Sequence, residues 1–229
     1  VHGFYDKGKT RTNASEAEAV VQHICRHFAD TGKRRLSLGV VTFSQTQQSL
    51  IEERLQQVFA ENTALAQWAT ASNEALFVKN LENVQGDERD IILFSVGYGP
   101  DEQGRVSMNF GPLNRDGGWR RLNVAVTRAR YAMHIFATLK SEQIDLARTA
   151  SQGVAGLKAF LDFAEKGRLA VQQNSITGHS ERRFLAESIA LRLQAHGLAT
   201  RCHIGTSDFK VDLAVVHPDK PQEYILAVL

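Results

Sequence analysis

The stretch D-I-I-L-F-S-V, from Asp90 to Val96, is the clearest buried strand in this chain. A charged turn precedes it, and a loop with four glycines, 97–111, follows it. Outward in both directions, short apolar runs typical of strands alternate with segments that repeat apolar residues at helical spacing. We expect strands at 36–42, 76–78, 90–96 and 132–137, and helices at 15–28, 44–60 and 120–130. This alternation predicts an α/β fold, a parallel sheet with flanking helices on both faces.

Composition changes near residue 150, and we expect three parts: a domain at 1–150, a connecting helix and linker at 151–177, and a small α/β piece at 178–229. The last piece begins with an amphipathic helix, 181–196, which Gly197 ends as a C-cap. Three strands follow at 199–204, 210–216 and 224–228, with Pro218 and Pro221 in the last turn. Because the sequence stops inside a strand, we expect a fragment of a longer parent protein.

The composition is that of an ordinary globular protein, with 43% hydrophobic and 23% charged residues among 229. A net charge of +2 gives no whole-chain attraction for nucleic acid, so any basic surface must be local. Cys25 and Cys202 lie far apart, which excludes a disulfide scaffold and a zinc ribbon and fits a reducing cytosol. Since no apolar run approaches 18 residues, we expect a cytoplasmic protein that does not span a membrane.

The N-terminal stretch contains the letters of a phosphate loop. Gly3-Phe4-Tyr5-Asp6-Lys7-Gly8-Lys9-Thr10 matches G-x-x-x-x-G-K-T. A working phosphate loop runs directly into its helix, where backbone N–H groups hold the phosphates. Here 11–13 intervene, and Ser15 and Glu18, spaced as a capping box, place the helix start at Ser15. We therefore favour a polar loop.

Two further segments carry chemistry-bearing residues. The segment Glu82 to Asp90 has five charges and one glycine, and it is either a solvated turn or a loop that aims carboxylates at a ligand. The segment Trp119 to Arg130 has four arginines and no acid. It is either a solvated basic face or a phosphate-binding element, because the guanidinium fork matches phosphate oxygens.

In this order, four segments resemble the second RecA-like domain of superfamily 1 helicases, in the branch of the nonsense-mediated-decay helicase. The resemblance covers roughly 1–137. The first two segments are Asn13–Ala17, similar to N-x-[ST]-E-A, and Val40–Gln47, similar to a strand ending in T-P-Y-x-x-Q. Val84–Asp90 is similar to helicase motif V, and Arg121–Arg130 is nearly identical to motif VI, R-x-N-V-A-[LV]-T-R-A-[RK].

The resemblance implies a role for each matching residue. Arg128 is expected to be the arginine finger that reaches the γ-phosphate of ATP, and Glu88 to accept a hydrogen bond from the ribose. Gln85 and Gly86 are expected along the nucleotide cleft, and Thr42 and Gln47 near the path of a single-stranded nucleic acid. Thr127 and Asn123 would hold the backbone of the finger.

The resemblance also implies partners and an absence. ATP with Mg²⁺ would lie between this domain and the N-terminal RecA-like domain of the same parent chain. The phosphate loop and the Mg²⁺ carboxylates of the family belong to that upstream domain and are not found here. We therefore expect an ATP-dependent helicase in the parent protein, with this fragment alone neither hydrolysing ATP nor unwinding.

The C-terminal piece, 197–229, is similar to the Vsr-like nuclease domain of some bacterial superfamily 1 helicases, in the restriction-endonuclease-like PD-(D/E)xK fold. Asp212 matches the first metal-binding aspartate of that fold, but Leu229 stands where a second carboxylate is expected. We expect a nuclease-like domain that does not cleave, and this association favours DNA over RNA. The alternatives are a metal-dependent DNA nuclease with a helicase motor, and a nucleic-acid-binding module without catalysis.

Overall fold

The computed structural model describes residues 1–71, 74–167, 186–204 and 211–228. The chain divides into two compact units, Val1–Glu165 and Lys166–Leu229, which are described one at a time. Most of the expected linker and Leu229 lie outside the described residues. Within the described part, no helix is long and apolar enough to cross a bilayer.

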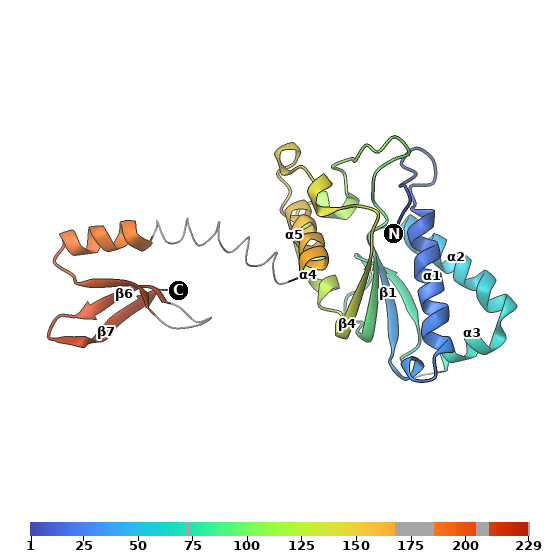
Figure 1. Ribbon diagram of the computed structural model, residues 1–229, viewed down its shortest axis with the longest axis horizontal. Coiled ribbons are helices and arrows are strands. Elements are labelled where there is room, and N and C mark those ends of the chain that lie inside the picture. The colour runs from blue at the N-terminus through green and yellow to red at the C-terminus, as the bar shows by residue number, and fades with distance from the viewer. Residues whose placement is uncertain (72–73, 168–185, 205–210, 229) are drawn as a thin grey trace. The chain divides into compact units, whose positions relative to one another are not determined.

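The first unit is built on a four-stranded sheet in the order β2-β1-β3-β4, with every neighbouring pair parallel (Figure 1). Its elements in chain order are α1 (Ala14–Ala29), η1 (Lys33–Arg35), β1 (Leu38–Thr42), α2 (Gln45–Glu61), α3 (Thr63–Thr70), β2 (Phe77–Asn80), β3 (Arg89–Ser95), η2 (Gly111–Asn114), α4 (Gly118–Val126), β4 (Ala129–Phe136), η3 (Ser141–Gln143), η4 (Leu146–Arg148) and α5 (Gln152–Lys166). The predicted α/β fold with a parallel sheet is confirmed.

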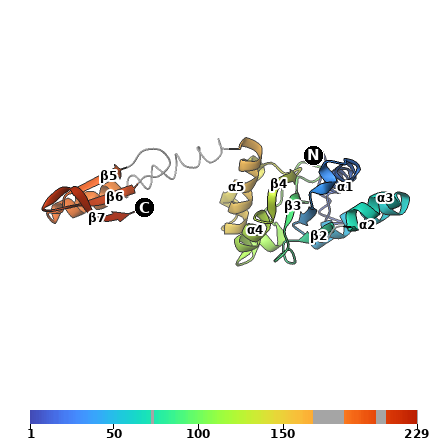
Figure 2. The same cartoon turned by 90° about the horizontal axis from the view of Figure 1, so that it is seen from below.

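Helices cover both faces of this sheet, with α1, α2 and α3 on one side and α4 and α5 on the other (Figure 2). The burial of β3 on both faces explains the continuous apolar run from which the fold was predicted. Ile92 and Phe94 pack into the core beneath α4 and α5, whereas Ile91 and Leu93 pack into the core beneath α1 and α2. Because successive side chains of a strand point to opposite faces, two buried faces require an unbroken apolar sequence.

The start of α1 differs from the prediction. Asn13, and not Ser15, is the N-cap: its side-chain oxygen accepts a hydrogen bond of 3.1 Å from the backbone N–H of Glu16. The physical reason is tertiary, since Asn13 is buried and its own N–H donates to the Gln47 side chain at 2.8 Å. The buried side chain of Glu16 completes this arrangement.

The predicted helix at 120–130 is too long at its C-terminal end. Helix α4 ends at Val126, and β4 already begins at Ala129. Strand pairing takes over here, because the N–H of Arg89 donates to the carbonyl of Arg128 at 3.1 Å and Arg89 is in register with Ala129. Arg128 therefore lies in the turn between α4 and β4, and Arg130 lies in the strand.

The helix that we expected to connect the two domains belongs to the first unit. Val154, Leu157 and Leu161 of α5 are buried in the core beneath β3. Gly153 allows this packing, because a Cβ on it would stand 2.3 Å from the carbonyl oxygen of Leu113.

The second unit contains a helix over 186–195 and a three-stranded antiparallel sheet in the order β5-β6-β7. The strands are β5 (Thr200–Ile204), β6 (Val211–His217) and β7 (Lys220–Val228). Gly197 ends the helix as predicted, with φ 82° and its N–H bonded to the carbonyl of Gln194 at 2.9 Å. Pro221 lies in β7 rather than in the preceding turn, so that part of the prediction was wrong.

Candidate functional site

The structure brings together Arg128 and Glu88, which are forty positions apart in the sequence. Glu88 immediately precedes β3, and Arg128 immediately precedes its parallel neighbour β4, so both residues lie at the amino edge of the sheet. Arg128 Nη1 and Glu88 Oε1 are 3.8 Å apart. The Arg128 side chain is 17% exposed and that of Glu88 is 52% exposed, so the pair faces solvent through the carboxylate.

The guanidinium of Arg128 is anchored from behind. Its Nε donates to the carbonyl of Val124 at 2.8 Å, and one Nη donates to Thr127 Oγ1 at 3.0 Å. Thr127 is held in turn, because its hydroxyl donates to the same carbonyl at 2.9 Å. An arginine has five N–H donors, so this anchoring leaves donors of Nη1 and Nη2 for an anion. The contact with Glu88 is too long for a hydrogen bond and is a weak, partly exposed ion pair.

The loop before β3 forms a tight turn that exposes Gln85 and Gly86. Gly86 has φ 90°, a conformation that favours glycine, while a Cβ on it would meet no atom within 4 Å. Asp87 fixes the turn through its N–H, which donates to the carbonyl of Val84 at 3.3 Å, and through its carboxylate, 2.5 Å from Lys79 Nζ. The backbone at Gly86 is therefore held in a defined turn and is exposed to solvent.

Arg130 has a different role from Arg128, and sequence reasoning did not find its partners. Its guanidinium donates to Asp90 Oδ1 at 2.9 Å, to Glu74 Oε1 at 2.9 Å and to Ser37 Oγ at 3.0 Å. The hydrogen bond from Arg130 lowers the pKa of Glu74 to about 2. This network joins β3, β4 and the segment before β1, so Arg130 holds the amino edge together.

Thr42 and Gln47, which we expected near a nucleic-acid strand, lie at the opposite, carboxyl edge. Strand β3 has seven residues, which separates the two edges by roughly 20 Å. Both side chains are fully buried. Thr42 Oγ1 donates to the carbonyl of Ser44 at 2.9 Å, and Gln47 Nε2 donates to the carbonyl of Asn13 at 3.1 Å. In this structure the two side chains are buried behind the carboxyl edge, where their hydrogen bonds hold neighbouring backbone segments.

Glu16 is the centre of a buried polar network at the carboxyl edge. The sequence analysis included it as the glutamate of the N-x-[ST]-E-A match at Asn13–Ala17 but assigned it no role. Its carboxyl oxygens accept hydrogen bonds from the N–H of Gly97 at 2.7 Å, the N–H of Thr138 at 2.8 Å and the hydroxyl of Ser95 at 3.1 Å. Burial raises the pKa of Glu16 to about 7 against these hydrogen bonds. The ends of β3 and β4 are thus tied to the start of α1.

The stretch that matches a phosphate loop does not have the geometry of one. Its N–H groups are used internally: Tyr5 N donates to the carbonyl of Pro100 at 2.8 Å, and Thr10 N donates to Asp6 Oδ2 at 3.1 Å. Helix α1 begins only at Ala14. The preference for a polar loop over a phosphate loop agrees with this arrangement.

Asp212 lies on β6 between two paired residues, Val211 opposite Ile204 and Leu213 opposite Cys202. Its side chain is partly exposed. Across the described residues, no group of three His, Cys, Asp or Glu side chains is placed to hold a metal ion. Leu229 and the loop 205–210 lie outside that part of the chain.

The first unit is thus a parallel α/β domain, with a charged pair at one edge and a buried polar network at the other. The chain belongs to the AAA-domain family, which matches residues 3–140, more than half of the sequence.

Two curated proteins are similar to the chain. It is 39% identical over 162 residues to the uncharacterized ATP-dependent helicase MG140 of Mycoplasma genitalium, and 37% identical over 162 residues to the homolog in Mycoplasma pneumoniae. Each alignment covers 69% of this chain but 14% of the relative, so the chain spans a small part of those proteins.

Among solved structures, the chain is similar to the C-terminal domain of a possible DNA helicase from Lactobacillus plantarum WCFS1. The two share 14% sequence identity with a TM-score of 0.34, over 60% of this chain and 73% of the other.

Proposed function

We propose that this chain is the C-terminal RecA-like part of an ATP-dependent nucleic-acid helicase. The observation that carries the proposal is the anchored guanidinium of Arg128, which stands beside Glu88 at the edge of the sheet with N–H donors to spare. Membership of the AAA-domain family and similarity to proteins named ATP-dependent helicases support it.

The residues of this edge fit a nucleotide by their chemistry. Arg128 would neutralise charge that develops on the transferred γ-phosphoryl group, and its two anchors, the carbonyl of Val124 and the hydroxyl of Thr127, would keep it in place without reorganisation. Glu88, with an exposed carboxylate, would accept a hydrogen bond from a ribose hydroxyl. ATP would supply the phosphoryl group, and Mg²⁺ bound with it would offset part of the negative charge of the phosphates.

The remaining residues of the motifs would connect the nucleotide site to the bound nucleic acid. Gln85 and Gly86 form the exposed turn before β3, so a conformational change at the nucleotide site would be passed on to β3. Thr42 and Gln47 are buried, and we assign them a positioning role at the far edge. The substrate is a single-stranded nucleic acid, with DNA favoured over RNA.

For the second unit we propose a nuclease-like fold that does not cleave. Asp212 is its one matched metal-binding carboxylate. A two-metal phosphodiesterase site holds its ions about 3.5–4 Å apart, which a single aspartate does not achieve unaided.

The division of the ATP site between two domains is testable with the 229-residue chain itself. We expect no ATP hydrolysis by the purified chain, and nucleic-acid-stimulated hydrolysis by the full-length parent protein, measured by phosphate release. Steady turnover by the chain that Lys9→Ala abolishes would contradict the proposal, and it would make the stretch Gly3 to Thr10 a working phosphate loop.

A further inference from the structure

Glu88 ends the loop that joins β2 to β3, and polar contacts hold this end of the loop. Leu81 and Val84 are buried and fix the first half of the loop in the core. The second half, 85–88, contributes no side chain to the core, and three of its four residues are exposed. Asp87 is the half-buried one. The direction of the Glu88 carboxylate therefore depends on what holds residues 87 and 88.

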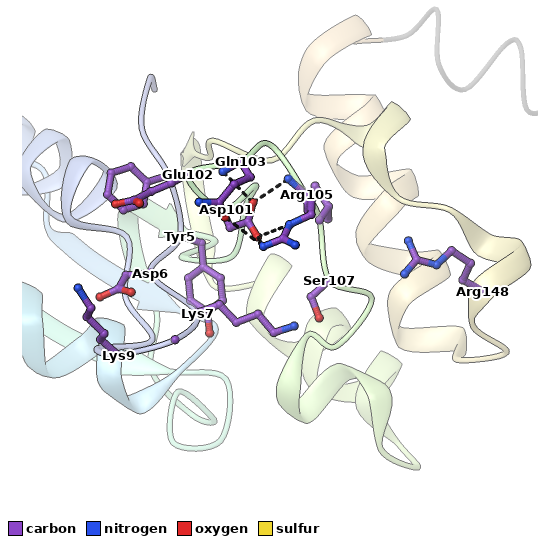
Figure 3. A pocket seen from close by; sticks show the side chains of 13 residues that line it. Tyr5, Asp6, Lys7, Lys9, Asp101, Glu102, Gln103, Arg105, Ser107 and Arg148 are labelled. Carbon is purple, nitrogen blue, oxygen red and sulfur yellow. Dashed lines mark hydrogen bonds and ion pairs between the residues drawn. The ribbon is translucent and has the colours of Figure 1, made fainter.

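The largest hollow described in the first unit does not support Glu88 from outside. This hollow, of about 740 Å³, is lined by residues 4–9, by the loop after β3 and by Arg148 (Figure 3). Glu88 is not part of its lining, and the Glu88 side chain is half exposed, with Arg128 Nη1 3.8 Å away. A loop that carries a ligand contact without pocket walls needs anchors of its own.

Lys79 anchors the residue before Glu88. Its Nζ donates to Asp87 Oδ2 at 2.5 Å, and the two side chains are only 33% and 29% exposed. Lys79 lies on β2, where it is in register with Val41 of β1, so the cation is supplied by the sheet and not by the loop. A short, charge-assisted hydrogen bond that is largely shielded from water holds its partners more firmly than an exposed ion pair.

Arg89 anchors the backbone of Glu88 itself. Its Nη1 donates to the carbonyl of Glu88 at 2.6 Å, while its Nε and Nη2 donate to the carbonyl of Ala75 at 3.1 and 2.7 Å. The guanidinium thus ties the end of the loop to the segment that precedes β2. With one cation on residue 87 and another on residue 88, both neighbours of the exposed carboxylate are fixed.

One aromatic ring orients both cations. Phe77 and Lys79 are two positions apart on β2, so their side chains share a face of the strand. The centroid of the Phe77 ring lies 5.7 Å from Lys79 Nζ and 4.7 Å from the guanidinium carbon of Arg89. Cation–π attraction places a cation without using its N–H donors, which leaves those donors for Asp87 and for the Glu88 carbonyl.

We infer that Lys79 and Arg89 are positioning residues, which hold the carboxylate of Glu88 in the direction that a nucleotide ribose requires. The inference rests on the proposed helicase function, and it adds two residues to which the sequence analysis assigned no role. An acceptor held in place before the ligand arrives loses less conformational freedom on binding. Removal of the Lys79 contact therefore weakens the ribose hydrogen bond and leaves the anchors of Arg128 intact.

Steady-state hydrolysis of ATP, 2′-deoxy-ATP and 3′-deoxy-ATP by the full-length parent protein tests the role of Lys79. For the unmodified protein we expect kcat/KM to fall about tenfold for the analogue that lacks the hydroxyl bound by Glu88. In Lys79→Met this penalty should shrink to about twofold. The KM for ATP should rise by about three- to tenfold with kcat within twofold, because the ribose contact is equally present in the ground state and the transition state.

Rescue separates positioning from general damage. The charge swap Lys79→Asp/Asp87→Lys should restore at least half of the lost discrimination against the deoxy analogue. The matched control is Arg54→Met, which removes a partly buried cation on α2 that is paired with Glu18 at 2.6 Å, and it should leave the discrimination unchanged. Circular dichroism melting checks that each variant is folded.

Two results would overturn the inference. One is a Lys79→Met protein that retains the full discrimination, since loss of stability alone moves KM for ATP and for its analogues alike. The other is an unmodified protein that hydrolyses all three nucleotides equally well. Both leave the helicase proposal standing if Arg128→Ala abolishes turnover, whereas a parent protein without any ATP hydrolysis would overturn the helicase proposal and this inference together.

Discussion

At the scale of single residues, the two arginines that end motif VI have separate tasks. Arg128 is held by backbone and hydroxyl oxygens and keeps donors for an anion, whereas Arg130 is bound to Glu74 and Asp90. The sequence placed both arginines in one motif, but it could not show which of them is already bound to carboxylates of the protein. That distinction depends on Glu74, which lies 56 positions from Arg130 and belongs to no recognisable pattern.

We expect Glu16 to make the stability of the first unit depend on pH. Its pKa is raised from 4.5 to about 7, so its contribution is fully present below pH 4.5 and is lost as the pH rises through 7. A shift of this size corresponds to a fall on the order of 3 kcal/mol in the free energy of unfolding. We expect urea unfolding between pH 5 and pH 8 to show this fall in the unmodified chain and a much smaller one in Glu16→Gln.

The Glu16→Gln comparison isolates one group, because His23, whose pKa burial lowers to about 4, is present in both proteins. The variant should also be less stable by about 1–3 kcal/mol at pH 5, since its amide NH₂ would face an N–H or hydroxyl donor. Identical pH slopes in the two proteins would show that Glu16 does not titrate in this range.

At the scale of secondary structure, sequence patterns identified the strands and most helices of the first unit. They did not predict the ends of those elements where tertiary contacts determine them. Strand β3 could be located in the sequence because both of its faces are buried, which gives it an unbroken apolar run. Helix α4 ends early because Arg89 pairs with Ala129, a partner forty positions away. Helix α3, eight residues long, was not predicted. Boundaries that depend on distant partners are invisible to local periodicity.

The cap of α1 provides a paired test of this point. Asn13→Ala should lower the free energy of unfolding by about 1–2 kcal/mol, because it removes the N-cap acceptor and a buried amide. Ser15→Ala should change the free energy by no more than about 0.5 kcal/mol, since Ser15 is not the cap. Chemical denaturation of both variants measures the difference. A larger effect at Ser15 than at Asn13 would restore the capping box expected from the sequence.

The sheet of the second unit offers one matched carboxylate for metal chemistry. We expect the full-length protein to leave supercoiled plasmid intact in Mg²⁺ or Mn²⁺ without ATP, as followed on agarose gels. The reason is that Asp212 lacks a second carboxylate at position 229. Nicking by the unmodified protein that disappears in Asp212→Ala would show a complete nuclease site instead.

At the scale of the whole molecule, one sheet of the first unit separates two candidate sites. The Arg128–Glu88 pair lies at its amino edge, and the buried Glu16 network lies at its carboxyl edge. Strand β3 runs from one to the other, starting after Glu88 and ending at Ser95, which donates to Glu16. The motifs named residues at both edges, but only the fold shows that these edges are distinct.

The role of Arg128 is tested most directly by ATP hydrolysis in the full-length parent protein carrying Arg128→Ala. The matched control is Arg120→Ala, an exposed arginine on α4 whose guanidinium lies over the Trp119 ring at 5.3 Å. We predict that Arg128→Ala lowers turnover by about 10³- to 10⁵-fold while binding of a fluorescent ATP analogue is retained, and that Arg120→Ala leaves turnover within a fewfold of the unmodified protein. Unchanged turnover in a folded Arg128→Ala protein would contradict the assignment of the arginine finger.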